Sequence, residues 1–222
     1  MLRIAIDGAC RRNGKPDCVA AGGVFIMQYK DFNLVATDTK SNYEHNSTNQ
    51  RGELLALLTA LDYVYAAGQT TQIITDSEYI FNAMTKQWYT KWRYSGWVTA
   101  SGEPVKNADI WREIAHSVDK CAEMDIDIMY YHIKGHCIPF GRVTAERLMD
   151  MDRTCMLIYG EISKKYDAVK TTKAANLAAA QELSVKNNGF NFSDEILKEF
   201  VVANAVADAV ATSVVEAADR KI

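Results

Sequence analysis

Residues 48–65, "TNQRGELLALLTALDYVY", and residues 71–76, "TQIITD", contain the clearest structural pattern in the chain. Apolar side chains at positions 54, 57, 58, 61 and 65 recur at helical spacing, so the first segment predicts an amphipathic helix. The second segment predicts a short buried strand that ends in an acid. A helix that leads into a buried strand is typical of a crossover in an α/β sheet.

The flanking segments extend this pattern. Residues 2–7, 21–29 and 33–40 predict three strands, and the Asp7-Gly8 pair is expected to end the first of them in a turn. Helices are expected from Ser77 and over 107–123, with a strand at 125–133, which gives the order βββαβααβ. Beyond Gly141 the pattern is helical, over 144–170, 172–186 and one or two helices within 190–221.

Composition limits the function classes. The chain has 222 residues, of which 48% are hydrophobic, and this suits one domain with a full core. A net charge of −3 gives no overall attraction to nucleic acid, so a polyanion would need a local basic patch. No signal peptide or apolar run of membrane-spanning length is expected. The five cysteines include no CxxC pair, which indicates neither a disulfide framework nor a zinc site. We therefore expect a soluble, cytoplasmic protein without membrane contact.

Three acids lie at the ends of separate elements. Asp7 follows the first predicted strand, Glu53 lies early in the first helix, and Asp76 ends the fourth strand. Each alone has an ordinary structural explanation: turn chemistry for Asp7, the helix dipole for Glu53 and a helix cap for Asp76. Together they converge on the edge of an α/β sheet where ligand sites collect. Clustered carboxylates repel one another unless a cation joins them, and such oxygen ligands suit Mg²⁺ or Mn²⁺.

Five blocks carry a family resemblance. They are "IAIDGACRRNG", "STNQRGELLALLTAL", "IITDSEYIFNAM", "GWVTASGEPVKNADIWREI" and "IKGHC", spread over residues 1–141. In order and spacing the chain resembles a type 1 ribonuclease H. The resemblance implies a five-stranded mixed sheet flanked by helices, and hydrolysis of the RNA strand of RNA–DNA hybrids, leaving 5′-phosphate and 3′-hydroxyl ends. It also implies two Mg²⁺ or Mn²⁺ ions held by Asp7, Glu53, Asp76 and a fourth acid. His136 would assist proton transfer or product release.

The resemblance also implies substrate contacts. Residues 84–106 alternate cations with tryptophans, and Trp88, Lys91 and Arg93 fall in the family's basic protrusion, which contacts the DNA strand. Amide and hydroxyl side chains that can bind sugar or phosphate fall on matching positions, at Asn13, Thr48, Asn49, Gln50 and Asn107. Ala9 stands where the family usually has serine, which removes one local hydrogen bond.

The fourth acid has competing positions. Family members follow the histidine loop by Asn-x-x-Ala-Asp-x-Leu-Ala; "GRVTAERLM" (141–149) keeps the spacing with Glu146, and "NAVADAVA" (204–211) keeps the residues with Asp208. The helix around Asp208 is apolar nearly all round and should be buried, where an unpaired carboxylate is costly unless it coordinates metal. This favours Asp208 over Glu146, with Asp150 and Asp152 as further alternatives.

Choosing Asp208 makes residues 1–222 a single domain with a C-terminal helical insertion over 142–200. That insertion would enlarge the core, cover the cleft, or bind a protein partner or a second copy. Two alternative functions stay open: a nuclease of the same fold acting on another nucleic acid, and a catalytically silent hybrid-binding module.

Overall fold

The structure is a computed structural model that describes residues 1–133, 135, 160–161, 163–164 and 193–219. Its centre is one five-stranded sheet with the order β3-β2-β1-β4-β5. Strands β1 (Leu2–Arg11), β2 (Val19–Lys30) and β3 (Asn33–His45) form an antiparallel meander. Strands β4 (Thr71–Thr75) and β5 (Ile128–His132) extend the sheet in parallel with β1. The prediction of a mixed five-stranded sheet is confirmed.

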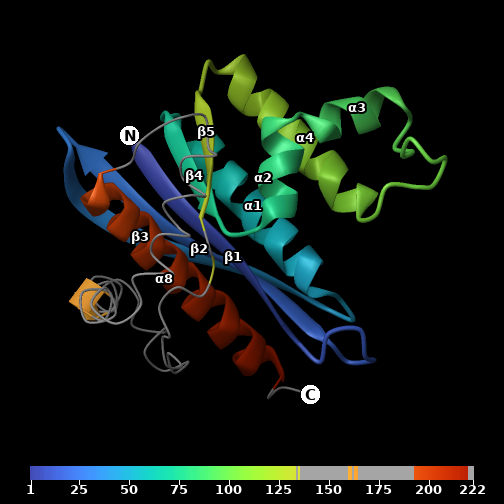
Figure 1. Cartoon of the computed structure of the whole chain (residues 1–222), viewed down its shortest axis with the longest axis horizontal. Coiled ribbons are helices and arrows are strands. Elements are labelled where there is room, and N and C mark those ends of the chain that lie inside the picture. Colours follow the sequence, from blue (N-terminus) through green and yellow to red (C-terminus); the bar gives the residue numbers. More distant parts are fainter. Residues whose placement is uncertain (134, 136–159, 162, 165–192, 220–222) are drawn as a thin grey trace.

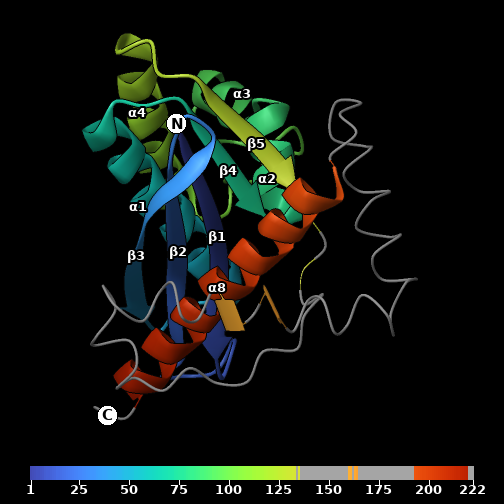
Figure 2. The same cartoon turned by 90° about the vertical axis from the view of Figure 1, so that its left-hand side faces the viewer.

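Helices cover both faces of this sheet (Figures 1 and 2). Helices α1 (Asn49–Ala67), α2 (Glu78–Thr85), α3 (Trp88–Tyr94) and α4 (Ala108–Glu123) lie on one face. Helix α8 (Asp194–Asp219) crosses the other face alone among the described helices and packs on β1 and β2. Thr48 caps α1 by accepting a hydrogen bond from the Arg51 amide, and Gly68 ends the helix in a left-handed conformation.

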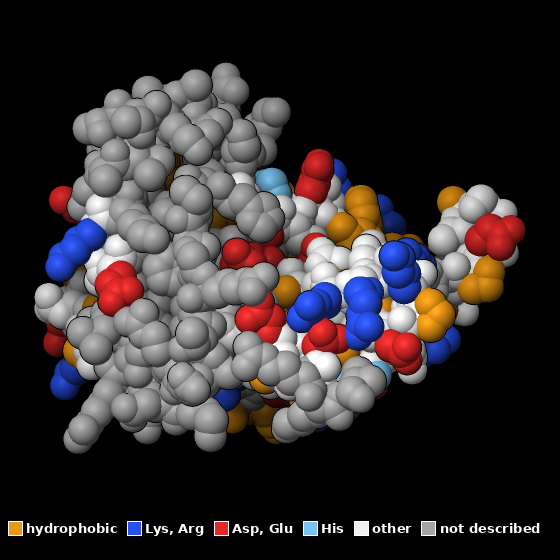
Figure 3. Space-filling model, turned by 90° about the horizontal axis from the view of Figure 1, so that it is seen from below, with side chains coloured by type: hydrophobic (Ala, Val, Ile, Leu, Met, Phe, Trp, Pro, Cys, Tyr) orange, Lys and Arg blue, Asp and Glu red, His pale blue; other side chains and the backbone are white. Residues whose placement is uncertain are grey.

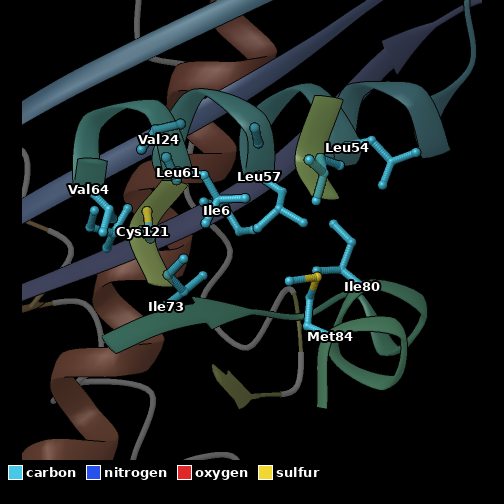
Figure 4. Packing of buried hydrophobic residues seen from close by; sticks show 14 of the residues in the cluster. Ile6, Val24, Leu54, Leu57, Leu61, Val64, Ile73, Ile80, Met84 and Cys121 are labelled. Atoms are coloured by element: carbon cyan, nitrogen blue, oxygen red, sulfur yellow. The ribbon is translucent and has the colours of Figure 1, made fainter. Parts of the chain in front are cut away.

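Each face has its own apolar core. On the α1 side, buried residues from the sheet and helices interlock, including Ile6, Ile73, Leu57 and Ile80 (Figure 4). On the α8 side, Phe25, Met27 and Tyr131 from the strands meet Phe200 and its neighbours from the helix. The sheet is therefore buried on both of its faces.

Helix α8 is the one helix in the described part of the chain that is long and apolar enough to cross a membrane. Two-thirds of its most apolar window (67%) is buried inside the molecule, as expected for a core helix. The apolar pattern that predicted burial of residues 200–215 is thus explained by packing on the sheet.

Two predictions about elements need correction. Strand β1 does not end at Asp7 but continues to Arg11, because β2 pairs with it as far as Arg11 and Val19. Residues 88–94 form an additional helix, α3, so the order begins βββαβαααβ. Its seven residues are too few to show helical periodicity, and its Trp92 packs on Trp111 of α4, with ring centroids 5.4 Å apart. For residues 190–221, where one or two helices were expected, the structure has a single helix over 194–219. The helices predicted over 144–170 and 172–186 lie almost wholly outside the described residues.

Candidate active site

Asp7 lies at the centre of the candidate site. It follows Ile6, the last β1 residue paired with β4, and pairs across to Gly23 of β2. Its side chain is 8% exposed. One carboxylate oxygen accepts a hydrogen bond from the Gly8 amide (2.7 Å), and the other accepts one from Asn204 Nδ2 (3.3 Å). Two donors therefore orient this buried carboxylate.

Glu53 approaches from α1. Its Oε2 accepts a hydrogen bond from the Ser77 hydroxyl at 2.6 Å, and its Oε1 accepts one from Asn49 Nδ2 at 3.2 Å. The same Ser77 hydroxyl caps α2 by accepting from the Ile80 amide. The sequence predicted Ser77 as a helix start but not its contact with Glu53, which joins residues 24 apart.

Asp76 follows β4 directly, as predicted. His132, at the end of β5, places Nε2 3.1 Å from the Asp76 carbonyl oxygen, so the ring nitrogen must be the donor. Gly135 packs against the Asp76 side chain so closely that a Cβ there would lie 2.8 Å from Asp76 Cγ. His132 was not identified from the sequence, because only the parallel pairing of β4 with β5 brings it to Asp76.

Helix α8 brings Asp208 and Asn204 to the same place. Asn204 is buried and contacts Asp7, although 197 residues separate them. Asp208 lies one turn further along the helix, accepts a hydrogen bond from the Thr212 hydroxyl (3.3 Å) and acts electrostatically on Asp7. His136, Glu146, Asp150 and Asp152 lie outside the described residues.

The electrostatics of Asp7 describe a concentrated negative charge. Burial raises the pKa of its carboxyl well above the ordinary value, and repulsion from Asp76, Asp208 and Glu53 raises it further. Burial likewise raises the pKa of Glu53, against the lowering effect of the Ser77 hydrogen bond. Four carboxylates from β1, α1, the end of β4 and α8 thus act on one point.

A divalent cation fits this donor set by its chemistry. Oxygen ligands of net negative charge are those that Mg²⁺ and Mn²⁺ prefer, and a cation would relieve the repulsion around Asp7. Within the described residues, no three His, Cys, Asp or Glu side chains already stand in a ligand cluster. Asp7, Glu53, Asp76 and Asp208 are the described residues that would hold such an ion.

The predicted substrate contacts form two groups. Asn13, in the β1–β2 loop, accepts a hydrogen bond from the Asn49 amide at 3.4 Å, next to the Thr48 cap of α1. Gln50 and Asn107 form a second pair, with Asn107 Nδ2 donating to Gln50 Oε1 at 3.3 Å. All five polar residues predicted for substrate binding lie at or near the N-terminal end of α1 (the fifth is Thr48 itself).

The residues predicted on the basic segment differ in how accessible they are. Lys91 is exposed on α3, whereas Trp88 is half-buried and packs against Trp92 with ring centroids 6.1 Å apart. Arg93 forms an ion pair with Asp119 of α4 (2.9 Å). Figure 3 shows acidic side chains gathered in a hollow on one face, with lysine and arginine side chains on the adjoining surface. Further acidic side chains lie among these cations in the same view.

The mixed sheet, with acids converging where β1 and β4 end their pairing, defines a ribonuclease H-like protein. A model of the RNase H family matches residues 2–149, two-thirds of the chain, and the chain belongs to this family. The matched segment ends at residue 149. Helix α8, whose Asn204 contacts Asp7, begins only at residue 194 and so lies beyond that segment.

Individual relatives agree with this assignment. The ribonuclease H of Alcanivorax borkumensis is 34% identical over 145 residues, covering 65% of this chain and 86% of that protein. The ribonuclease H of Cereibacter sphaeroides is 33% identical over 150 residues, covering 68% and 91%. The solution structure of the PFV RNase H domain is 26% identical, with a TM-score of 0.50, and covers 61% of this chain and 79% of that one.

Proposed function

We propose that this chain is a metal-dependent endonuclease that hydrolyses the RNA strand of RNA–DNA hybrids. Family membership supports the enzyme class. The observation that carries the proposal is the environment of Asp7, a buried carboxylate on which Glu53, Asp76 and Asp208 act from three other elements. Such a concentration of buried negative charge is unfavourable in a purely structural role.

In this proposal Asp7, Glu53, Asp76 and Asp208 hold two Mg²⁺ or Mn²⁺ ions. When bound, these ions would supply activation of the attacking water and stabilisation of the leaving 3′ oxygen, leaving 5′-phosphate and 3′-hydroxyl ends. His136 would assist proton transfer or product release. Within the described chain, Asn204 orients Asp7 and Ser77 orients Glu53. His132 holds the backbone of Asp76.

The hybrid would lie across the N-terminal end of α1 and continue over α3. Asn13, Thr48, Asn49, Gln50 and Asn107 offer short amides and hydroxyls to sugar and phosphate, and the 2′-hydroxyl distinguishes RNA from DNA. Lys91 and Trp88 would contact the DNA strand. Arg93 would join them only by exchanging its ion pair with Asp119 for a phosphate.

Asp208 is our proposed fourth acid, and residues 142–200 are our proposed insertion within a single domain. Both proposals are supported by the position of α8, which packs on β1 and β2 and carries Asn204 to Asp7. A helix that carried Glu146 to Asp7 instead would have to share this face of the sheet with α8.

The test measures Mg²⁺-dependent cleavage of three matched substrates: an RNA–DNA hybrid, an RNA duplex and a DNA duplex. We expect cleavage of the hybrid's RNA strand alone, and loss of at least about 100-fold in kcat for Asp76→Asn. Equal cleavage of all three substrates, or an Asp76→Asn enzyme with full activity, would refute the proposal. Comparing Asp208→Asn with Glu146→Gln assigns the fourth acid: our assignment fails if only the Glu146 change abolishes turnover.

A further inference from the structure

Two cysteine side chains meet at the base of the β1–β2 loop. Cys10 Sγ and Cys18 Sγ lie 2.6 Å apart, on either side of the last paired residues of the hairpin, Arg11 and Val19. This separation is far shorter than an ordinary contact between sulfur atoms, and it exceeds a disulfide bond by only about 0.6 Å. The backbone therefore already holds both sulfurs where a covalent bond needs little movement.

The pair can be reached from solvent on one side. Cys18 is buried, but Cys10 is partly exposed and lines a pocket of about 250 Å³ together with Ala9, Arg11 and three residues of α8. A small reagent would therefore meet Cys10 first, and Cys18 would be the second thiol to react. Burial and the contact with Cys18 raise the pKa of the Cys10 thiol to about 12, so reaction at neutral pH should be slow and should accelerate as pH rises.

We infer that Cys10 and Cys18 form a thiol–disulfide site that closes the β1–β2 loop when a small-molecule disulfide oxidises it. In the first step the Cys10 thiolate attacks the oxidant and forms a mixed disulfide, releasing one thiolate. In the second step the Cys18 thiolate attacks Cys10 Sγ and releases the other. The two protons lost by the cysteines pass to the two released thiolates. The protein pair is oxidised by two electrons and the reagent disulfide is reduced to two thiols.

The loop that this bond would close contacts α1 and α8, the two helices that carry Glu53 and Asp208. Residues 11–17 are exposed, and Asn13 among them contacts the Asn49 amide. Arg11 and Arg12 form ion pairs with Asp219 at the end of α8. A disulfide at the base of the loop should therefore change the affinity for a hybrid without moving the four acids. This consequence for binding rests on the proposed function; formation of the bond does not.

The experiment uses the full chain with Cys121→Ser, Cys137→Ser and Cys155→Ser, so that only the pair remains. After treatment with excess oxidised glutathione, we expect a tryptic product that joins residues 4–11 to residues 13–30 and is two hydrogens lighter than the reduced peptides. Closing a nine-residue loop should raise Tm by about 5–10 °C, and dithiothreitol should reverse the rise. Cys18→Ser in this background is the matched control and should show neither change.

Persistent free thiols, a stable mixed disulfide on Cys10, or cross-linking between chains would each overturn the inference. The activity measurement is separate: oxidation should change KM for the hybrid and leave kcat unchanged. An unchanged KM would overturn the effect on binding. An enzyme inactive in both redox states would refute the proposed function, while the peptide and Tm measurements would still decide the disulfide.

Discussion

Substitution of Gly23 by alanine tests whether α8 completes the site. Gly23 of β2 pairs with Asp7, and α8 crosses directly over it. A Cβ at Gly23 would lie 2.6 Å from the Ala211 amide nitrogen and closer still to the Ala207 carbonyl oxygen. Because both neighbours are backbone atoms of a helix, no side-chain rotation can relieve the clash. The helix that carries Asp208 must move away from the sheet.

The magnitude follows from these contacts. Clearing Ala211 alone to 3.0 Å requires a shift of about 0.4 Å, and Ala207 requires more. Overpacking of this kind costs about 1–3 kcal/mol, which corresponds to a fall in Tm of roughly 3–10 °C for a chain of this size. Without α8, a strand glycine replaced by alanine would gain about 0.4–1 kcal/mol through the unfolded state. Gly23→Ala should therefore lower Tm if α8 lies on β2 at this point, and raise it if α8 does not.

Thermal unfolding and single-turnover cleavage measure both consequences. Displacing an acid by a fraction of an ångström should lower the cleavage rate by about 10- to 100-fold at a temperature where the variant stays folded. Gly160→Ala is the matched control, because a Cβ at Gly160 meets nothing within 4 Å: the cleavage rate should stay at the wild-type value, and Tm should not fall but rise by the small gain of alanine over glycine. A Gly23→Ala protein with unchanged Tm and rate would show that α8 does not lie on β2 at this point.

Three further predictions concern charge and burial. Hydrogen bonds from Arg51 hold the pKa of the Glu44 carboxyl below its ordinary 4.5 and that of Asp109 below its ordinary 3.8. The stability that these bonds contribute is therefore fully present above the ordinary pKa values and is lost as the pH falls through the lowered pKa values. Because Asp109 is largely exposed, Arg51→Met should lower the free energy of unfolding by only about 1 kcal/mol at pH 7. Urea unfolding should show that this loss shrinks below about pH 4. A loss that does not depend on pH would contradict the prediction. The Tyr130 hydroxyl is buried with no hydrogen-bond partner among the described residues, so Tyr130→Phe should raise the free energy of unfolding by up to about 1 kcal/mol, and a clear loss would refute this. Asp7→Asn should abolish cleavage. In EDTA it should nevertheless raise the free energy of unfolding by about 1–2 kcal/mol, because it removes the repulsion between Asp7 and the other acids. A lower free energy of unfolding in EDTA would argue against the charge cluster.

Local pattern was enough to predict most of the fold. The α1 helix and the acid after β4 follow from periodicity and from the turn after a buried strand, and both were found where expected. The predicted end of β1 was wrong, because an Asp-Gly pair forms a turn only where no neighbouring strand pairs with the residues that follow it. Here β2 continues the ladder to Arg11, and that pairing overrides the local preference. Strand ends set by distant partners cannot be read from a dipeptide.

The site itself was only partly predictable for the same reason. Asp7, Glu53 and Asp76 could be singled out because the sequence places each near a predicted element boundary, although β1 continues past Asp7 in the structure. The residues that orient them could not, because Ser77 and His132 act across contacts of 24 and 56 residues. Such contacts depend on the order of the strands in the sheet. The sequence predicts a mixed sheet but does not fix that order.

Close packing, rather than local propensity, sets how the acids approach one another. Gly8 admits Glu53, whose Cγ would lie 2.7 Å from a Cβ at that position, and Gly135 admits Asp76 in the same way. Gly23 admits the α8 backbone beside Asp208. At each of these positions the missing Cβ is what lets a neighbouring chain bring a carboxylate toward Asp7. Any side chain at these glycines would separate the carboxylates, lower their mutual repulsion and so weaken the pull on a divalent cation. The glycines therefore contribute to the electrostatics of the site although they carry no charge.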